Sequence, residues 1–164
     1  MVVLARRAIN FPVSSSSTSN EIEYRPARGD DISFIFDSWL RSWRKSPWAG
    51  VIPNNVYFPL TRSTIEQLVG RGATFLVACL AADQERILGW ICHEQSGPDA
   101  VVHFIYVKDP YLSLGIADAL LERIPGKKPG FYTFRYRQVV DACQPARTRD
   151  REGWVHAPEI ARRK

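Results

Sequence analysis

Residues 106–124, YVKDPYLSLGIADALLERI, combine the end of an apolar strand, a short turn that contains Gly115 and an amphipathic helix. The first backbone N–H groups of a helix have no partner within the helix and carry a partial positive charge, so such a junction can bind phosphate oxygens. A glycine at the junction lets a ligand approach the backbone closely. The alternative is that Gly115 only allows a tight turn between a strand and a helix.

Hydrophobic periodicity predicts the elements that position this junction. Alternating apolar residues indicate strands, and apolar residues that repeat every three or four positions indicate helices. The predicted strands are residues 21–27, 73–82, 86–95, 100–109 and 131–140, and the predicted helices are residues 32–43, 63–71 and 116–124. The aromatic-rich residues 45–60 are predicted to form a loop. This order predicts an α/β or α+β sheet protein.

Length and composition are those of one globular domain. The chain has 164 residues, of which 45% are hydrophobic and 24% charged, and this length is sufficient for a sizeable core. No apolar run approaches the roughly 18 residues of a membrane span, so no membrane partner is expected. Residues 1–20 are rich in serine and contain no acid. We expect a flexible tail there, with a transit peptide as the alternative, and a single domain over residues 21–164.

The three cysteines, Cys79, Cys92 and Cys143, are too far apart and too few for a disulfide framework or a zinc site. No metal site is therefore expected. Cys79 and Cys92 lie inside apolar runs and are predicted to be buried. This use of cysteine favours a reducing, cytoplasmic setting.

The net charge of +5 is concentrated at one end of the chain. Residues 125–164 contain 10 Lys and Arg but only 4 Asp and Glu, whereas residues 1–124 contain 12 and 13. A basic C-terminal segment can attract nucleic acid or another polyanion. The alternative is a solvated surface.

The order of elements and the junction motif together resemble the Gcn5-related N-acetyltransferase (GNAT) family, over roughly residues 21–154. The family motif is Arg or Gln, two residues, Gly, one residue, then Gly or Ala. In LSLGIA, residues 112–117, Gly115 and Ala117 match, but Leu112 replaces the polar residue. The resemblance implies a mixed, mostly antiparallel sheet flanked by helices, in the order β-α-α-β-β-β-α-β.

The resemblance also implies acetyl-CoA as co-substrate, held at the junction and along the fourth strand. The backbone of Ile105 to Val107 would bond the pantetheine arm and the acetyl oxygen. The pyrophosphate would lie at the junction, so the implied cofactor-binding residues are Ile105, Val107, Leu112, Ser113, Leu114, Gly115, Ile116 and Ala117.

Acetyl transfer to an amine needs a group that removes a proton. Some members of the family have a Glu four residues before the Val that ends the fourth strand, and here that position is His103. The pKa of histidine suits this role. His93 and Glu94, on the preceding strand, are alternative bases, and alternation along a strand predicts that one of them faces the site. A strand histidine bonded to a neighbour is the alternative for His103.

The proton donor of the family is a Tyr a few residues before a Gly-Phe pair, which resembles Gly153 and Trp154 here. Residues 148–150 contain no tyrosine, and this departure, like Leu112, puts activity in question more than fold. The family reads its acceptor with the loop between the first two helices. Trp43, Trp48 and Tyr57 are therefore candidate substrate-binding residues, with a small core under the loop as the alternative.

Two functions follow from this sequence. The first is an N-acyltransferase that moves an acetyl or similar acyl group from CoA to an amine. The second is a non-catalytic protein of the same fold, whose basic C-terminus contacts nucleic acid or another acidic partner.

Overall fold

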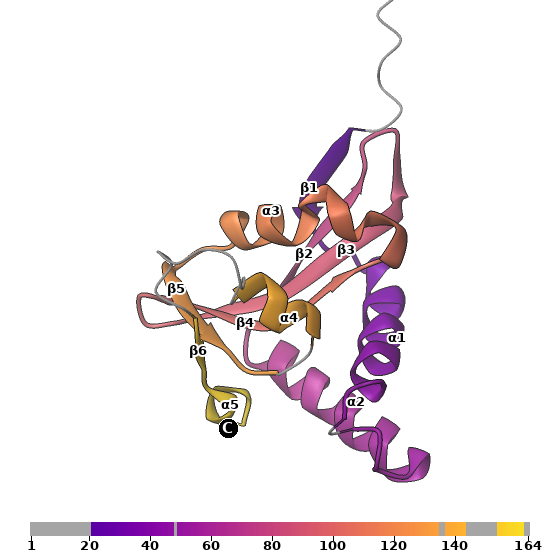
Figure 1. Cartoon of the computed structure of the whole chain (residues 1–164), viewed down its shortest axis with the longest axis vertical. Coiled ribbons are helices and arrows are strands. Elements are labelled where there is room, and N and C mark those ends of the chain that lie inside the picture. Colours follow the sequence, from indigo (N-terminus) through magenta and orange to yellow (C-terminus); the bar gives the residue numbers. More distant parts are fainter. Residues whose placement is uncertain (1–20, 48, 135–136, 144–153, 163–164) are drawn as a thin grey trace, which may run out of the picture.

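The computed structural model describes residues 21–47, 49–134, 137–143 and 154–162. Its strands form one sheet in the order of the chain (Figure 1): β1 (Ile22–Pro26), β2 (Thr74–Leu80), β3 (Asp83–Ser96), β4 (Asp99–Val107), β5 (Lys127–Tyr132) and β6 (Val155–His156). β1 to β4 are antiparallel, whereas β5 pairs with β4 and β6 with β5 in parallel. The expected mixed, mostly antiparallel sheet is confirmed.

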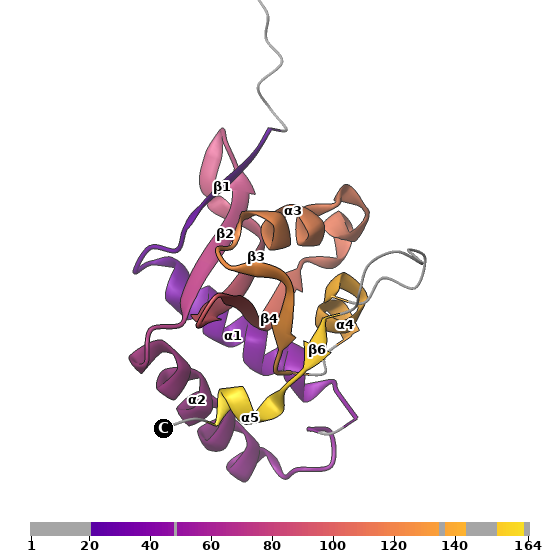
Figure 2. The ribbon, with the colours of Figure 1, turned by 90° about the vertical axis from the view of Figure 1, so that its left-hand side faces the viewer.

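Helices cover both faces of this sheet (Figures 1 and 2). They are α1 (Asp31–Arg44), α2 (Asn54–Gly70), the 3-10 helix η1 (Asp109–Leu114), α3 (Ile116–Arg123), α4 (Arg137–Cys143) and α5 (Pro158–Ala161). α1 and α2 lie over one face, and α3 and α4 over the other. The short helix α5 packs at the β5 and β6 end of the sheet, on the side of α2.

The core under α1 is a stack of aromatic rings. The rings of Trp39 and Phe104 are stacked with centroids 4.9 Å apart, and those of Trp90 and Phe104 are 5.7 Å apart. The indole N–H of Trp90 donates to the hydroxyl of Ser38 at 2.9 Å. On the opposite face, a Cβ at Gly89 would lie 2.7 Å from the carbonyl oxygen of Tyr106, so this close approach requires glycine.

Two predicted elements differ from the structure. Residues 131–140 are not one strand, because β5 ends at Tyr132 and α4 begins at Arg137. Val139 and Cys143 are both buried and four residues apart, which is helical spacing. The β-branched and aromatic residues around them favoured a strand, and packing against β4 overrides that propensity.

The second helix is longer than the predicted residues 63–71. α2 begins at Asn54, inside the predicted loop, and continues through Pro59. The buried positions Tyr57, Thr61, Ile65 and Leu68 form one continuous stripe at helical spacing. Pro59 lies on the exposed side, where its ring does not disturb this packing.

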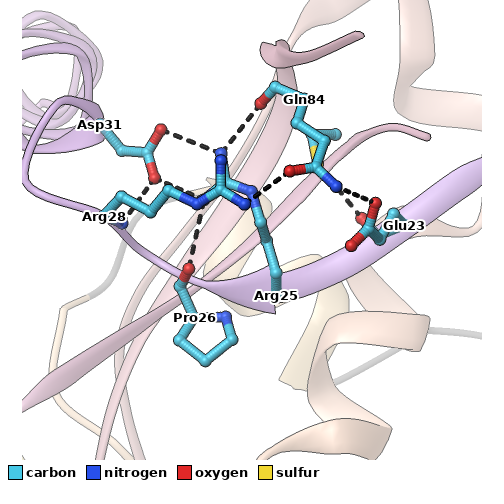
Figure 3. A network of polar contacts seen from close by, with 7 residues as sticks. Glu23, Arg25, Pro26, Arg28, Asp31 and Gln84 are labelled. Carbon is cyan, nitrogen blue, oxygen red and sulfur yellow. Dashed lines mark hydrogen bonds and ion pairs between the residues drawn. The ribbon is translucent and has the colours of Figure 1, made fainter. Parts of the chain in front are cut away.

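A buried ion pair joins β1 to α1 (Figure 3). The guanidinium of Arg25 donates to both carboxylate oxygens of Asp31, at 2.6 and 3.1 Å, and to the carbonyl of Gln84 at 2.9 Å. Asp31 also accepts the backbone N–H of Arg28 at 2.7 Å. The hydrogen bond from Arg25 is the main reason that the pKa of Asp31 is lowered. One charge pair thereby joins the first strand, the start of the first helix and the start of β3.

Replacing Asp31 with Ala is expected to lower the free energy of unfolding by about 3–5 kcal/mol, because it leaves the Arg25 guanidinium buried without its counter-charge. Asp37 is the matched control, since it belongs to the same helix but pairs with Arg41 on the surface. Asp37→Ala should change the value by no more than about 0.5 kcal/mol. Urea denaturation measures both variants, and equal losses would show that the buried pair does not anchor β1.

Candidate active site

The pairing of β3 with β4 changes register at His103. Cys92 lies opposite Phe104 and His93 opposite Val102, so β4 carries one additional residue between these pairs, and that residue is His103. Such a β-bulge bends its strand and turns a side chain out of the regular alternation. The pairing of β4 with β5 has its last strand pair at Val102. In the described residues, β4 and β5 therefore separate where β4 bends.

Beyond the bulge, β4 presents backbone groups to the side that β5 has left. The N–H of Lys108 bonds the carbonyl of Leu88, on β3, so by alternation the N–H and C=O of Ile105 and Val107 point away from β3. At Val107 these groups already have a partner. Its N–H donates to Oε1 of Gln138 at 2.7 Å, and its C=O accepts from Nε2 of Gln138 at 3.0 Å. A side-chain amide thus pairs with the β4 edge as the amide of a ligand would.

The junction around Gly115 has the geometry of a tight turn. Gly115 lies between η1 and α3 with φ 69° and ψ 16°, in the left-handed region that favours glycine. A Cβ at this position would meet no atom within 4 Å, so the space beside the turn is open. Ser113, Leu114, Gly115, Ile116 and Ala117, the predicted phosphate donors, lie at the start of α3 or directly before it.

A cavity of about 410 Å³ lies between this junction and α4. It is called the α3–α4 cavity below, and its lining residues are Val107, Asp109, Leu112, Ala117, Asp118, Arg137, Gln138 and Asp141. Predicted cofactor-binding residues from β4, the turn and α3 therefore meet at one cavity. Three carboxylates face it against one guanidinium, that of Arg137, which lies 3.6 Å from Asp141. The side chains of this lining are negative on balance and therefore disfavour a phosphate. The backbone N–H groups at the start of α3 favour one.

On the other side of the separated strands, polar groups converge on His103. Its side chain is completely buried, and its Nδ1 lies 2.9 Å from the hydroxyl of Thr133, the residue that follows β5. Its Nε2 lies 3.5 Å from the carboxylate of Glu94. Arg71, which follows α2, donates to both oxygens of Glu94, at 2.9 and 3.2 Å. Alternation along β3 predicted that one of His93 and Glu94 faces the site, and Glu94 lies beside His103. The catalytic roles of these residues stay predictions.

The protonation of this cluster follows from its surroundings. Burial lowers the pKa of His103, and Glu94 only partly offsets this, so the imidazole is neutral near pH 7. Burial raises the pKa of Glu94, but His103 and Arg71 outweigh it and the net pKa is lowered. Glu94 is therefore a carboxylate that can only accept hydrogen bonds. The negative charge of Glu94 beside Nε2 favours the tautomer of neutral His103 that carries its proton on Nε2, although Nε2 makes no hydrogen bond at 3.5 Å. In that tautomer, Nδ1 is the acceptor that faces Thr133.

His93 occupies a separate environment. Its Nε2 lies 3.3 Å from the hydroxyl of Thr74, on β2. Burial, with smaller contributions from His103 and Lys128, lowers the pKa of His93 to about 4. Of the two alternative bases on β3, Glu94 is therefore the one that contacts His103.

A second cavity, of about 510 Å³, lies where α2, α5 and the end of β5 meet. It is called the α2–α5 cavity below, and its lining residues are Trp43, Thr64, Thr133, Phe134, His156, Pro158, Ala161 and Arg162. The rings of Trp43 and Phe134 meet edge to face, with centroids 5.3 Å apart. Thr133 belongs both to this lining and to the His103 cluster.

The other candidate substrate-binding residues do not line this cavity. Tyr57 is buried, donates its hydroxyl to the carbonyl of Leu40 at 2.6 Å and lies under the guanidinium of Arg44. That placement fits the alternative of a small core under the loop. Trp48 lies outside the described residues, as do the candidate proton-donor region 148–150 and most of the basic C-terminal residues.

Sequence reasoning missed three residues of this site. Thr133 and Gln138 lay inside the segment predicted as a strand, and Arg71 ended a predicted helix without a partner. A signal was available in the sequence, because Val139 and Cys143 are four residues apart, which is helical spacing. That spacing would have predicted a helix that contains Gln138.

Other parts of the described structure add no further site. In the described ranges, no group of three or more His, Cys, Asp or Glu residues could hold a metal ion. Cys79 and Cys92 are buried as predicted, and Cys143 is buried as well. None of the helices in these ranges is long and apolar enough to cross a membrane.

No protein-family model and no curated protein matches this sequence. Among solved structures, a proposed acetyl transferase from Pyrococcus furiosus has a TM-score of 0.50 and 24% identity, over 62% of this chain and 70% of that chain. The PaiA N-acetyltransferase from Thermoplasma acidophilum, solved with coenzyme A, has a TM-score of 0.47 and 20% identity, over 62% and 68%.

An acetyltransferase of the GNAT family from Staphylococcus aureus Mu50 has a TM-score of 0.45 and 19% identity, over 63% of each chain. This chain has the fold of the GNAT acetyltransferases.

Proposed function

We propose that this protein is an N-acyltransferase that moves an acetyl or similar acyl group from CoA to an amine. The observation that carries this proposal is the separation of β4 from β5 at His103, with a cavity on each side of the sheet. A reaction between two substrates that approach from opposite faces needs such an opening.

The residues around the α3–α4 cavity fit a CoA thioester at one end better than at the other. The edge groups of Ile105 and Val107 fit the amides of a pantetheine arm, and Gln138 shows that an amide can pair with Val107. The N–H groups at the start of α3 fit a pyrophosphate. Leu112 supplies no side-chain donor there, and Asp109 and Asp118 oppose the charge. We therefore expect CoA to bind mainly through the backbone.

The chemistry of the site divides among the residues of the chain. When bound, the thioester supplies the activated acyl group. The N–H of Ile105, on the edge of β4 that faces away from β3, would donate to the thioester oxygen, where negative charge develops. His103 receives the proton that the amine loses, and Glu94 stabilises the resulting imidazolium. Arg71 holds Glu94 in place through two hydrogen bonds.

Leu112→Arg is expected to tighten the binding of acetyl-CoA by about threefold to tenfold, because it adds a charge-assisted hydrogen bond to a phosphate. Leu112 is 52% exposed, so the longer side chain needs no repacking. Isothermal titration calorimetry measures the dissociation constant. Leu60→Arg is the matched control, because Leu60 is 58% exposed on α2 and lines neither cavity. An equal gain in both variants would indicate non-specific attraction rather than a phosphate site.

His103→Gln is expected to lower kcat by about 100-fold, because it removes the proposed base. It should leave acetyl-CoA binding unchanged, because the backbone groups of Ile105 and Val107 remain. In the wild type, kcat/KM should fall as the pH drops through the lowered pKa of His103, below its ordinary value of 6.5. Glu94→Gln removes a carboxylate that raises the pKa of His103. The fall of kcat/KM on the acid side of the pH profile (the acid limb) should therefore move to lower pH.

Steady-state rates over a range of pH test both variants, with His93→Gln as the control that should keep the wild-type profile. An acid limb that stays in place in His103→Gln would assign the limb to another group and remove His103 from the mechanism.

A further inference from the structure

His103 does not reach the acceptor by itself. Its side chain is 0% exposed, and it is not among the residues that line the α2–α5 cavity. Thr133 does line that cavity, and its hydroxyl lies 2.9 Å from Nδ1 of His103. In the described structure, the hydroxyl of Thr133 thus links His103 to the cavity.

The direction of this hydrogen bond follows from the carboxylate on the other side of the ring. The carboxylate of Glu94 lies 3.5 Å from Nε2 and makes no hydrogen bond there, but its charge favours the ring proton on Nε2. In this tautomer, Nδ1 accepts the hydroxyl proton of Thr133. A threonine hydroxyl has one proton to donate and two lone pairs that accept. While the hydroxyl of Thr133 donates its proton to Nδ1 of His103, its oxygen can accept a proton from a group in the cavity.

We propose that Thr133 is a catalytic residue that takes the proton directly from the acceptor amine in the α2–α5 cavity and passes its own proton to Nδ1 of His103. This inference rests on the proposed acyltransferase function. In the step, an N–H bond of the ammonium breaks as an O–H bond to Thr133 forms. The original O–H bond of Thr133 breaks as an N–H bond to Nδ1 forms. The products are a neutral amine and an imidazolium, with no change in oxidation state.

The groups that face His103 support this transfer. Glu94, from β3, stabilises the imidazolium, whereas Arg71, after α2, opposes it through its positive charge. Arg71 is bonded to Glu94, which limits that opposition. His93, on the same strand as Glu94, has a pKa of about 4 and adds no charge near pH 7.

The lining of the cavity indicates the kind of amine. Trp43 and Phe134 form an aromatic wall, and Pro158 and Ala161 add apolar surface. No carboxylate is among the lining residues of the described chain, and Arg162 brings a positive charge. A polyamine would leave its additional charges without partners. The cavity therefore favours a primary amine on a flat apolar body, for which phenethylamine is a suitable probe and spermidine the contrasting one.

The test compares Thr133→Val, which keeps the shape but removes the hydroxyl, with Thr133→Ser, which keeps it. Thiol release from acetyl-CoA, with phenethylamine as acceptor, gives kcat/KM over a range of pH. Thr133→Val is expected to lower kcat/KM by about 100-fold, and Thr133→Ser by no more than about threefold. Thr74→Val, which removes the similar contact to His93 and lines neither cavity, should match the wild type.

The pH profile separates a relay from a structural role. Without the hydroxyl, the reaction depends on amine that is already neutral in solution, so the acid limb of Thr133→Val should move up towards the pKa of the amine. A Thr133→Val variant that binds acetyl-CoA and keeps the wild-type rate and limb overturns the relay and leaves the proposed function standing. A wild type that does not bind acetyl-CoA overturns both.

A third measurement needs neither a variant nor an acceptor. Nitrogen-15 chemical shifts of the His103 ring report which nitrogen carries the proton. The proposal expects the proton on Nε2, and a proton on Nδ1 overturns it, because Thr133 would then have no acceptor for its own proton. If acetyl-CoA binds but phenethylamine is not acetylated, the proposed acceptor class is wrong. The nitrogen-15 shifts then decide whether Thr133 can pass its proton to His103.

Discussion

The additional residue that β4 carries at His103 is the constraint on which the rest of the site depends. A strand that bends cannot keep straight partners on both edges, and β4 keeps β3 while it loses β5 after Val102. The bend therefore has two effects. It exposes the backbone edge of Ile105 and Val107 towards α4, and it turns His103 out of the alternation towards Glu94 and Thr133.

Ion pairing explains why charged groups are tolerated beside His103. An isolated charge in the interior is costly, so buried charges need partners. Arg71 and Glu94 satisfy each other through two hydrogen bonds, and His103 beside them stays neutral. A neutral base next to a fixed carboxylate can gain a proton without leaving a charge unpaired. The cluster is stable at rest and ready to accept a proton.

The sequence indicated the order of the elements and most of their bounds, because β2, β3, β4 and α1 carry strong periodic patterns. The resemblance to the GNAT family singled out His103 through the position that a Glu occupies in some members. The position of Gln138 was not predictable in the same way. Residues 131–140 have strand composition, and only contact with β4 makes their second half a helix. The position of Thr133 was equally unpredictable. It depends on where the pairing of β4 with β5 ends, and that is a property of both strands and not of one segment.

The two cavities differ in how their specificity arises. In the α3–α4 cavity, backbone groups of β4 and α3 offer the hydrogen bonds, and the side chains Asp109, Asp118 and Leu112 work against a phosphate or do not contribute. Backbone geometry changes little when a surface side chain is replaced, so the proposed cofactor site would survive the loss of the usual motif residue. The described lining of the α2–α5 cavity consists mainly of side chains that include Trp43, Phe134 and Arg162. If the proposed function holds, substitutions on that side would change the acceptor before they affect the binding of the donor.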